Sequence, residues 1–181
     1  MGDRAPLRIS IGGDLPESLV ENFLDYLRDS GAGTDYDGGL DHLFTGENEK
    51  LSHRERLEAL LAECDAVIGS REYVTVCDGQ ANYGSFPELE EFCKANKLSY
   101  DKHNDSGGDY DAGNEYIRDG KHVLDTLSTN HGDEDYIAAC RVVLARQALY
   151  EGNFTEAIRV LDEVVGRLWK LPPLPPFRVV P

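Results

Sequence analysis

Apolar and polar residues alternate near the start of this chain, at Leu7, Ile9 and Ile11, and the alternation predicts a strand with one buried face. We expect this strand to end at Gly12-Gly13. Short alternating runs on both sides of Asp119-Gly120 predict a hairpin, because that dipeptide favours a two-residue turn. The other predicted strands are residues 66–77, 98–103, 115–118 and 121–126.

Helical spacing of apolar residues is found between these strands. Three helices are expected to begin at capping boxes, in which a Ser or Asp is followed three positions later by Glu. The predicted boxes are Asp14 with Glu17, Ser52 with Glu55, and Ser85 with Glu88. Two further helices are expected at residues 133–151 and 154–170. The Leu-Pro-Pro-Leu-Pro-Pro segment that follows cannot be helical and is expected to be extended.

This order of elements predicts an α+β fold, in which a small mixed or antiparallel sheet is covered by helices. An αα-hairpin and an extended proline-rich tail complete the chain. We expect residues 1–132 to form an acidic α+β domain, residues 133–170 to form a helical hairpin packed on it, and residues 171–181 to form the tail. A chain of 181 residues can bury such a core without disulfides or a metal.

The predicted hairpin has a recognisable pattern of small and apolar residues. Its characteristic positions are Leu144, Ala145 and Ala148 on the first helix, and Gly152, Phe154, Ala157, Ile158 and Leu161 at the turn and on the second helix. In these residues the hairpin resembles a single tetratricopeptide unit. Such units bury a continuous core only when about three or more of them stack, and the sequence contains no second copy. A plain αα-hairpin is the alternative.

Charge adds the first indication of function, because it is large and uneven. The chain has 34 acidic and 18 basic residues and a formal net charge of −16. Residues 1–150 hold 30 of the acids and 14 of the bases, whereas residues 151–181 hold four of each. Such a field repels phosphate backbones and anionic lipids and attracts basic proteins. The expected partner is therefore a basic surface of another protein, and not nucleic acid or a membrane; the oligomeric state stays open.

Two predicted loops concentrate the carboxylates. Residues 29–49 hold six acids and no base, and residues 101–119 hold six acids and two bases. Tyrosines beside the acids would add rigid contact area to a charged surface. The partner-binding residues expected from these loops are Asp35, Tyr36, Asp37, Asp41, Glu47, Glu49, Asp105, Asp109, Tyr110, Asp111 and Glu115.

Candidate chemistry is sparse. Gly12-Gly13 has the position of a phosphate-binding turn, but Asp14 would place a negative charge where the phosphate should lie. Asp101, His103 and Asp105 are candidate metal ligands in an oxygen-rich loop, although the spacing is not that of an EF-hand. His103 could also approach His122 on a neighbouring strand. No cofactor is expected.

The sequence also lacks an activated nucleophile. The four cysteines form no CxxC pair and are expected to be reduced and structural. No serine lies in a GxSxG elbow. The sequence thus leans against an enzyme without excluding one. Neither a signal sequence nor an apolar run long enough for a membrane span is found, which favours the cytoplasm.

The function favoured by the sequence is a non-enzymatic acidic interaction protein, with a DNA-mimic inhibitor of a nucleic-acid-binding protein as its specific form. Small anti-restriction and anti-CRISPR inhibitors of phages and plasmids use this physics, and the chain is similar to them in composition and not in motif. Two alternatives are a divalent-metal-dependent enzyme using residues 101–115 and an adaptor using the hairpin and the proline tail. Adaptation of the host to salt would also explain the acidity.

Overall fold

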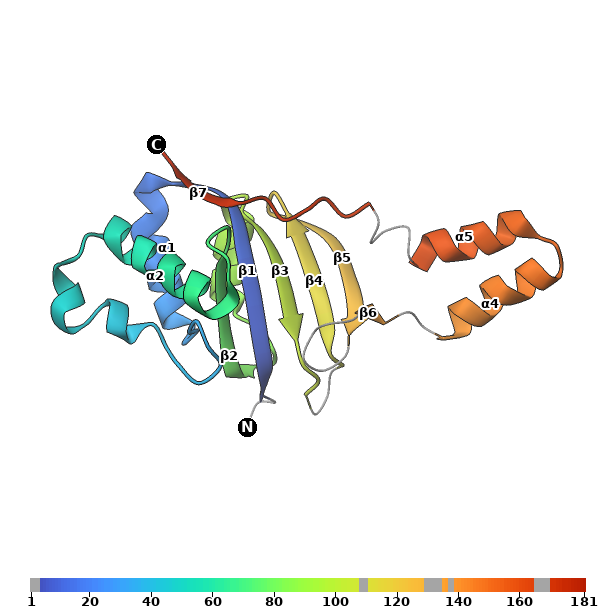
Figure 1. Ribbon diagram of the computed structural model, residues 1–181, viewed down its shortest axis with the longest axis horizontal. Helices are drawn as coiled ribbons and strands as arrows, with labels where there is room; N and C mark the ends of the chain where they lie inside the picture. The colour runs from blue at the N-terminus through green and yellow to red at the C-terminus, as the bar shows by residue number, and fades with distance from the viewer. Residues whose placement is uncertain (1–3, 108–110, 129–134, 137–138, 165–169) are drawn as a thin grey trace.

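The strands form one open sheet (Figure 1). The computed structural model describes residues 4–107, 111–128, 135–136, 139–164 and 170–181. Along the sheet the order is β2-β1-β3-β4-β5-β6, and all of these neighbours are antiparallel. Their bounds are β1 Arg4–Pro16, β2 Val74–Asn82, β3 Ser99–Asn104, β4 Gly113–Arg118, β5 Lys121–Ser128 and β6 Asp135–Tyr136. A last strand, β7 Phe177–Val180, pairs in parallel with the end of β1.

The helices form two separate groups. Three of them, α1 Val20–Asp29, α2 His53–Ile68 and α3 Pro87–Ala95, share one core with β1, β2 and β3. The other two, α4 Ala139–Tyr150 and α5 Phe154–Val164, form an antiparallel hairpin. Figure 1 shows α1 and α2 at one end of the molecule and the hairpin at the other. An α+β fold with helices packed on a sheet is therefore confirmed. None of the described helices is long and apolar enough to cross a membrane.

The core lies over the β2–β1–β3 half of the sheet. Leu7, Ile9 and Ile11 of β1 are fully buried, as their alternation predicts. Phe23 of α1 stacks on Phe92 of α3 and on Phe177 of β7, with ring centroids 5.9 and 5.5 Å apart. Two helices and the last strand thus meet at one aromatic cluster.

The first strand is longer than its sequence predicts. It continues through Gly12-Gly13 to Pro16, and no capping box forms at Asp14. The absence of a side chain at Gly12 allows the proline-rich segment to pass close to β1. A Cβ on Gly12 would lie 1.9 Å from the Pro175 carbonyl oxygen. The Gly13 amide donates to the Pro176 carbonyl at 3.2 Å. Pairing with β7 therefore extends β1 beyond the predicted stop.

Of the other two predicted capping boxes, one is confirmed. Ser52 and Glu55 bond reciprocally at the start of α2, and these hydrogen bonds lower the pKa of Glu55. The box predicted at Ser85 is wrong, because the carboxylate that reaches back is that of Glu90. It accepts from the Ser85 hydroxyl and from the Phe86 amide, both at 2.9 Å.

Three predicted boundaries also differ from the structure. Helix α2 extends to Ile68, so that the strand predicted at residues 66–77 begins only at Val74. The helix predicted from residue 133 begins at Ala139, because residues 135–136 pair with β5 as β6. The sheet thus includes residues beyond the predicted domain boundary at 132. The end of the last predicted helix, residues 165–169, lies outside the described residues.

The proline-rich tail is extended, as predicted, and bound to the sheet. The Arg118 guanidinium donates to the Pro172 carbonyl at 2.8 Å, and the Tyr73 hydroxyl donates to the Leu174 carbonyl at 3.3 Å. The Phe177 amide then donates to the Glu72 carbonyl at 2.7 Å, where β7 begins. We call residues 171–176 the strap, because they cross the sheet and fasten the C-terminal end of the hairpin to it.

Candidate functional site

The first predicted acidic loop follows the edge of β2. Gly33 forms a β-bridge with Cys77, and the Gly79 amide donates to the Tyr36 carbonyl at 2.9 Å. The side chains of Asp35, Tyr36 and Asp37 are exposed. These backbone contacts hold the three predicted residues on the surface beside the strand.

The rest of that loop is also on the surface. Asp41 is paired with Arg28 at 3.3 Å between Oδ1 and Nε, with both side chains largely exposed. Glu47 and Glu49 are exposed on a 3-10 turn, Gly46–Lys50. The loop therefore presents its carboxylates outward, although one of them has a basic neighbour within the chain.

The second predicted acidic segment is mostly occupied by internal contacts. Asp105 is buried and accepts from His103, with Oδ1 and Nε2 3.0 Å apart, and His103 Nδ1 lies 2.8 Å from Asn114 Oδ1. Asp101 pairs with Arg118 at 2.5 Å. The metal candidates Asp101, His103 and Asp105 are thus engaged in two separate polar contacts. Asp111 is exposed, and Asp109 and Tyr110 lie outside the described residues.

Glu115, the last predicted residue, belongs to a half-buried ion network. The Lys102 ammonium lies 2.6 Å from one Glu115 oxygen and 2.8 Å from Glu90. The other Glu115 oxygen faces Lys94 at 3.3 Å. Burial by itself lowers the pKa of Lys102, but the two carboxylates outweigh it and raise that pKa. Burial raises the pKa of Glu115, and Lys102 and Lys94 reverse the effect and lower it. Both shifts favour the charged forms of Lys102 and Glu115 at neutral pH.

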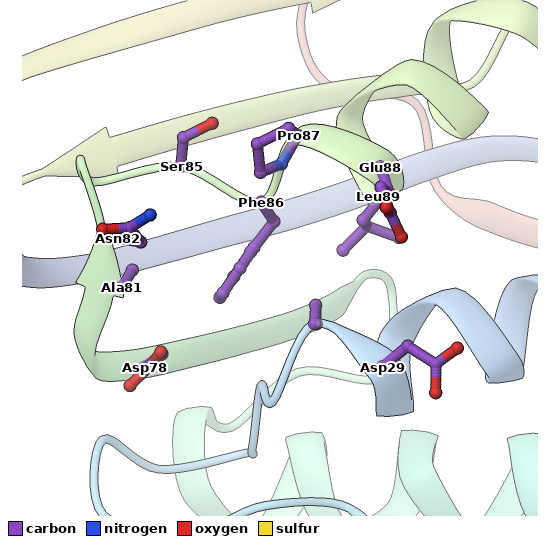
Figure 2. A pocket seen from close by; sticks show the side chains of 10 residues that line it. Asp29, Asp78, Ala81, Asn82, Ser85, Phe86, Pro87, Glu88 and Leu89 are labelled. Atoms are coloured by element: carbon purple, nitrogen blue, oxygen red, sulfur yellow. The ribbon is translucent and has the colours of Figure 1, made fainter. Parts of the chain in front are cut away.

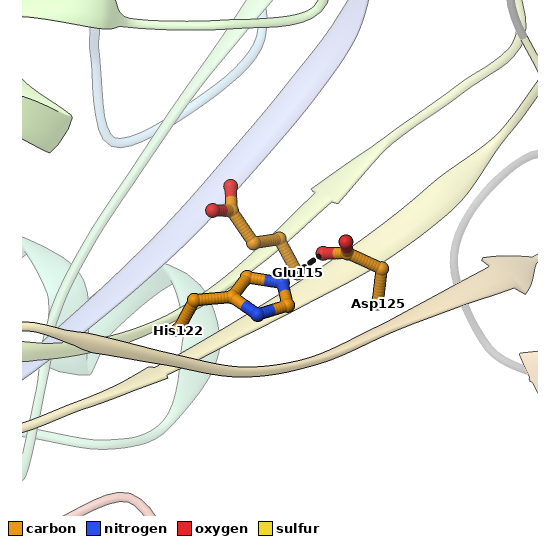
Figure 3. Close-up of side chains that lie close together, drawn as sticks. All are labelled: Glu115, His122 and Asp125. Carbon is orange, nitrogen blue, oxygen red and sulfur yellow. Dashed lines mark ion pairs between the residues drawn. The ribbon is translucent and has the colours of Figure 1, made fainter.

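Glu115 also lies near His122, which the sequence suggested as a neighbour of His103, and near Asp125, which the prediction did not select. Figure 3 shows Glu115, His122 and Asp125 together, with His122 Nε2 2.9 Å from Asp125 Oδ1. One ligand atom from each lies within 4.8 Å of the others, a spacing that could hold a metal ion. Two lysines already occupy the Glu115 oxygens, however, so a cation would have to compete with them. His122 and Asp125 are best explained as an exposed polar pair on the surface of β5.

A larger acidic feature lies at the end of the molecule formed by α1, α2 and α3, which we call the helical end. A hollow of about 320 Å³ is lined by Asp29 at the end of α1, Asp78 on β2 and Glu88 in the first turn of α3. Figure 2 shows these carboxylates on three separate elements, with Phe86 pointing between them. The hollow thus combines an apolar floor with acidic walls, a surface that suits the apolar stem and charged head of a lysine or arginine.

Two adjoining hollows extend this surface along α1 and α3. One is lined by Glu88, Glu91 and Tyr26, and the other by Glu21, Asp25 and Asp29. No Lys or Arg of the described chain lines any of the three hollows. We call this surface the acidic groove; its carboxylates are Glu21, Asp25, Asp29, Asp78, Glu88 and Glu91.

The acidic groove was not predicted, although three of its six carboxylates follow a helical spacing that is visible in the sequence. Glu21, Asp25 and Asp29 are spaced by four residues, which places them on the outer face of α1 about 6 Å apart along the axis. A helical wheel would have found them. Their approach to Glu88 and Asp78 depends on how α1, α3 and β2 pack, and no local pattern encodes that.

The three cysteines whose side chains the structure describes offer no nucleophile at this surface. Cys64, Cys77 and Cys93 are free and buried. Burial is the main cause that raises the pKa of Cys77 to about 11 and that of Cys93 to about 12. Thiols in this state are poor nucleophiles at neutral pH, because the thiolate is the reactive form.

Comparisons with known proteins do not assign the chain to a family: no family model, curated protein or solved structure matches it. Any functional conclusion therefore depends on the residues themselves.

Proposed function

We propose that this protein is a non-enzymatic interaction protein that binds a basic surface of another protein through the acidic groove and the neighbouring acidic loop. The observation that carries the proposal is the set of six carboxylates lining three adjoining hollows, with no lysine or arginine among the described residues of the lining. Such a surface attracts a basic partner over long range and repels nucleic acid directly.

A DNA mimic is the specific form of this proposal. The stripe Glu21–Asp25–Asp29 offers a negative charge about every 6 Å along α1, whereas one DNA strand offers one about every 3.4 Å of helix axis. Carboxylates of α3 and of the loop at Asp35 and Asp37 add to that density. A protein that normally holds phosphates with lysine and arginine would then bind this surface in competition with DNA.

The two alternatives have less support. In the metal-dependent alternative, Asp101 would have to leave Arg118 and Asp105 would have to leave His103. In the adaptor alternative, a proline-recognising partner would have to detach the strap from Arg118, Tyr73 and β1. Each requires buried or backbone contacts to be broken, whereas in the acidic groove the contacts of Glu21 with His53 and of Asp78 with the Gln80 amide leave the hollows accessible.

The experiment compares three variants that each remove three negative charges from a different place. The groove variant is Asp25→Asn, Asp29→Asn, Glu88→Gln; the loop variant is Asp37→Asn, Glu47→Gln, Glu49→Gln; the hairpin control is Glu151→Gln, Glu156→Gln, Asp162→Asn. Each tagged protein is used to retain proteins from host extract, which are identified by mass spectrometry. We expect basic proteins on the wild type, their loss from the groove variant and their retention by the control.

Salt and DNA complete the test. Retention should fall at least about tenfold between about 50 and 500 mM NaCl, because charges on a surface are screened. For the mimic form, added double-stranded DNA should displace the retained protein. Equal loss from all three variants would show that net charge alone matters, and salt-resistant binding of non-basic proteins would overturn the proposal.

A further inference from the structure

The helical hairpin exposes large apolar side chains on both of its helices. Their exposed fractions run from 42 to 75%, and they are Val142, Val143, Leu144, Leu149, Tyr150, Phe154, Ile158 and Leu161. A monomeric surface rarely exposes a contiguous apolar patch larger than a few hundred Å². The hairpin is therefore the part of the molecule with the strongest reason to be covered.

The contact between the two helices does not use these residues. It buries small side chains, Ala145 and Ala148 on α4 and Ala157 on α5, together with Val160. On α4, three consecutive positions, Val142 to Leu144, are apolar and exposed. Consecutive helical residues point about 100° apart, so one neighbouring helix cannot cover all three. Apolar helix surface of this width is normally buried against other elements.

On α5 the exposed residues form a single stripe. Phe154, Ile158 and Leu161 recur at spacings of four and three, beside the inner stripe of Ala157 and Val160. A stripe of this kind is what one helix presents to another across a bundle. The hairpin thus has one face used in its own contact and a second face of the same kind that none of the described residues covers.

Charge indicates which partner suits that second face. Residues 139–164 hold three bases and four acids, a net charge of −1, which leaves −15 for the rest of the chain. Arg159 pairs with Glu156 and Glu163, and Arg141 pairs with Glu163 at 3.5 Å. Since these four residues are paired within the hairpin and its net charge is only −1, a basic partner gains little there, whereas a second hairpin meets little repulsion.

We propose that two copies of this protein associate through their hairpins, each packing the exposed stripe of α5 and the exposed side of α4 against the other. A two-fold axis makes such a contact self-complementary, and the product is a four-helix bundle. Figure 1 shows the hairpin at the end of the molecule opposite α1 and α2. The two acidic grooves would then lie at the far ends of the dimer, where their like charges are most widely separated.

Sedimentation velocity of the full chain tests this from about 1 to 100 µM. The wild type should have twice the 20.1 kDa mass of one chain at the higher concentrations. Ile158→Glu should raise the dimer dissociation constant at least about 100-fold, because a carboxylate is unfavourable at the centre of an apolar interface. Val67→Glu is the matched control, since Val67 on α2 is 54% exposed and Ile158 is 58% exposed; it should change the constant less than about threefold.

A second variant distinguishes loss of the dimer contact from misfolding of the hairpin. Phe154→Ala, Ile158→Ala, Leu161→Ala keeps good helix formers on α5 and should also yield monomers, with an unchanged circular-dichroism spectrum. Raising NaCl should leave the dimer intact or strengthen it. Salt screens the repulsion between the acidic ends but does not screen apolar contacts. A wild type that is monomeric at about 100 µM at both low and high salt overturns the proposal, as does a dimer that Ile158→Glu leaves intact. Neither result bears on binding by the acidic groove.

Discussion

The two ends of this molecule treat hydrophobic residues in opposite ways. At the helical end, Phe23, Leu24 and Leu27 of α1 are fully buried against α3, the sheet and β7, and the acids point outward. At the hairpin end, Phe154, Ile158 and Leu161 are as regularly spaced but exposed. The strongly acidic end has a fully buried apolar core. The hairpin end is nearly neutral and leaves part of its apolar surface exposed. An apolar stripe thus predicts a helix reliably, but not what covers it.

Removing one phenylalanine from each end should have very different effects on stability. Phe23→Ala should lower the free energy of unfolding by about 3–5 kcal/mol, because it removes a fully buried ring from the aromatic cluster. Phe154→Ala should change it by less than about 0.5 kcal/mol in the monomer, because that ring is 65% exposed. Urea unfolding at low protein concentration measures both, and similar losses would mean that the hairpin is covered within the monomer.

The ion network of Lys102, Glu90 and Glu115 should also contribute to stability. Lys102→Met should cost about 3 kcal/mol, because it leaves Glu90 and Glu115 without their central cation. The exposed Lys50→Met is the control and should be nearly neutral.

The pH dependence of the Lys102→Met effect follows from the two pKa shifts. The folded-state pKa of Glu115 lies below its usual 4.5, so its contribution is present above that pH and is lost as the pH falls through the folded value. The folded-state pKa of Lys102 lies above its usual 10.5, so its contribution is present below that pH and is lost as the pH rises through the folded value. The difference between wild type and Lys102→Met should therefore be constant between about pH 5 and 10 and shrink outside that window. A difference that grows on acidification would contradict the assignment.

The smallest expected effect concerns the strap that links the two ends. Gly12→Ala would place a methyl group 1.9 Å from the Pro175 carbonyl oxygen, so either the strap or β1 must shift. We expect a loss of about 1–3 kcal/mol and faster proteolysis within residues 171–181. Gly39→Ala, where no atom lies within 4 Å of the added carbon, is the control. Identical stability of the two variants would show that the strap contributes nothing.

Local chemistry made much of the fold predictable. The Ser52–Glu55 box and the Asp119-Gly120 turn require only neighbours in sequence, and both are found as predicted. The errors share another cause. Asp14 lies in a strand because β7 arrives from the other end of the chain, and Ser85 bonds Glu90 because Glu90 also pairs with Lys102. Distant residues override the local preference at each of these positions.

The candidate site was predictable only where the local sequence decides whether a side chain is exposed. The carboxylates at Asp35, Asp37, Glu47 and Glu49 lie in a polar loop, and their exposure follows from that. Burial of Asp105 depends on His103, which no spacing rule reveals. An irregularity between β4 and β5 at Val123 sets Asp125 opposite Glu115, whereas the regular register of a two-residue turn would place Leu124 there. The acidic groove depends on three elements packing together.

Pairing of the last strand with the first sets the order in which the molecule can be completed. Gly13 lies opposite Phe177, so β1 and β7 can pair only when residues far apart in the sequence come together. Contacts that close so long a loop form slowly and late. An intermediate that lacks β7 would expose Phe23 and the end of β1, and would be open to aggregation until the strap closes over Gly12.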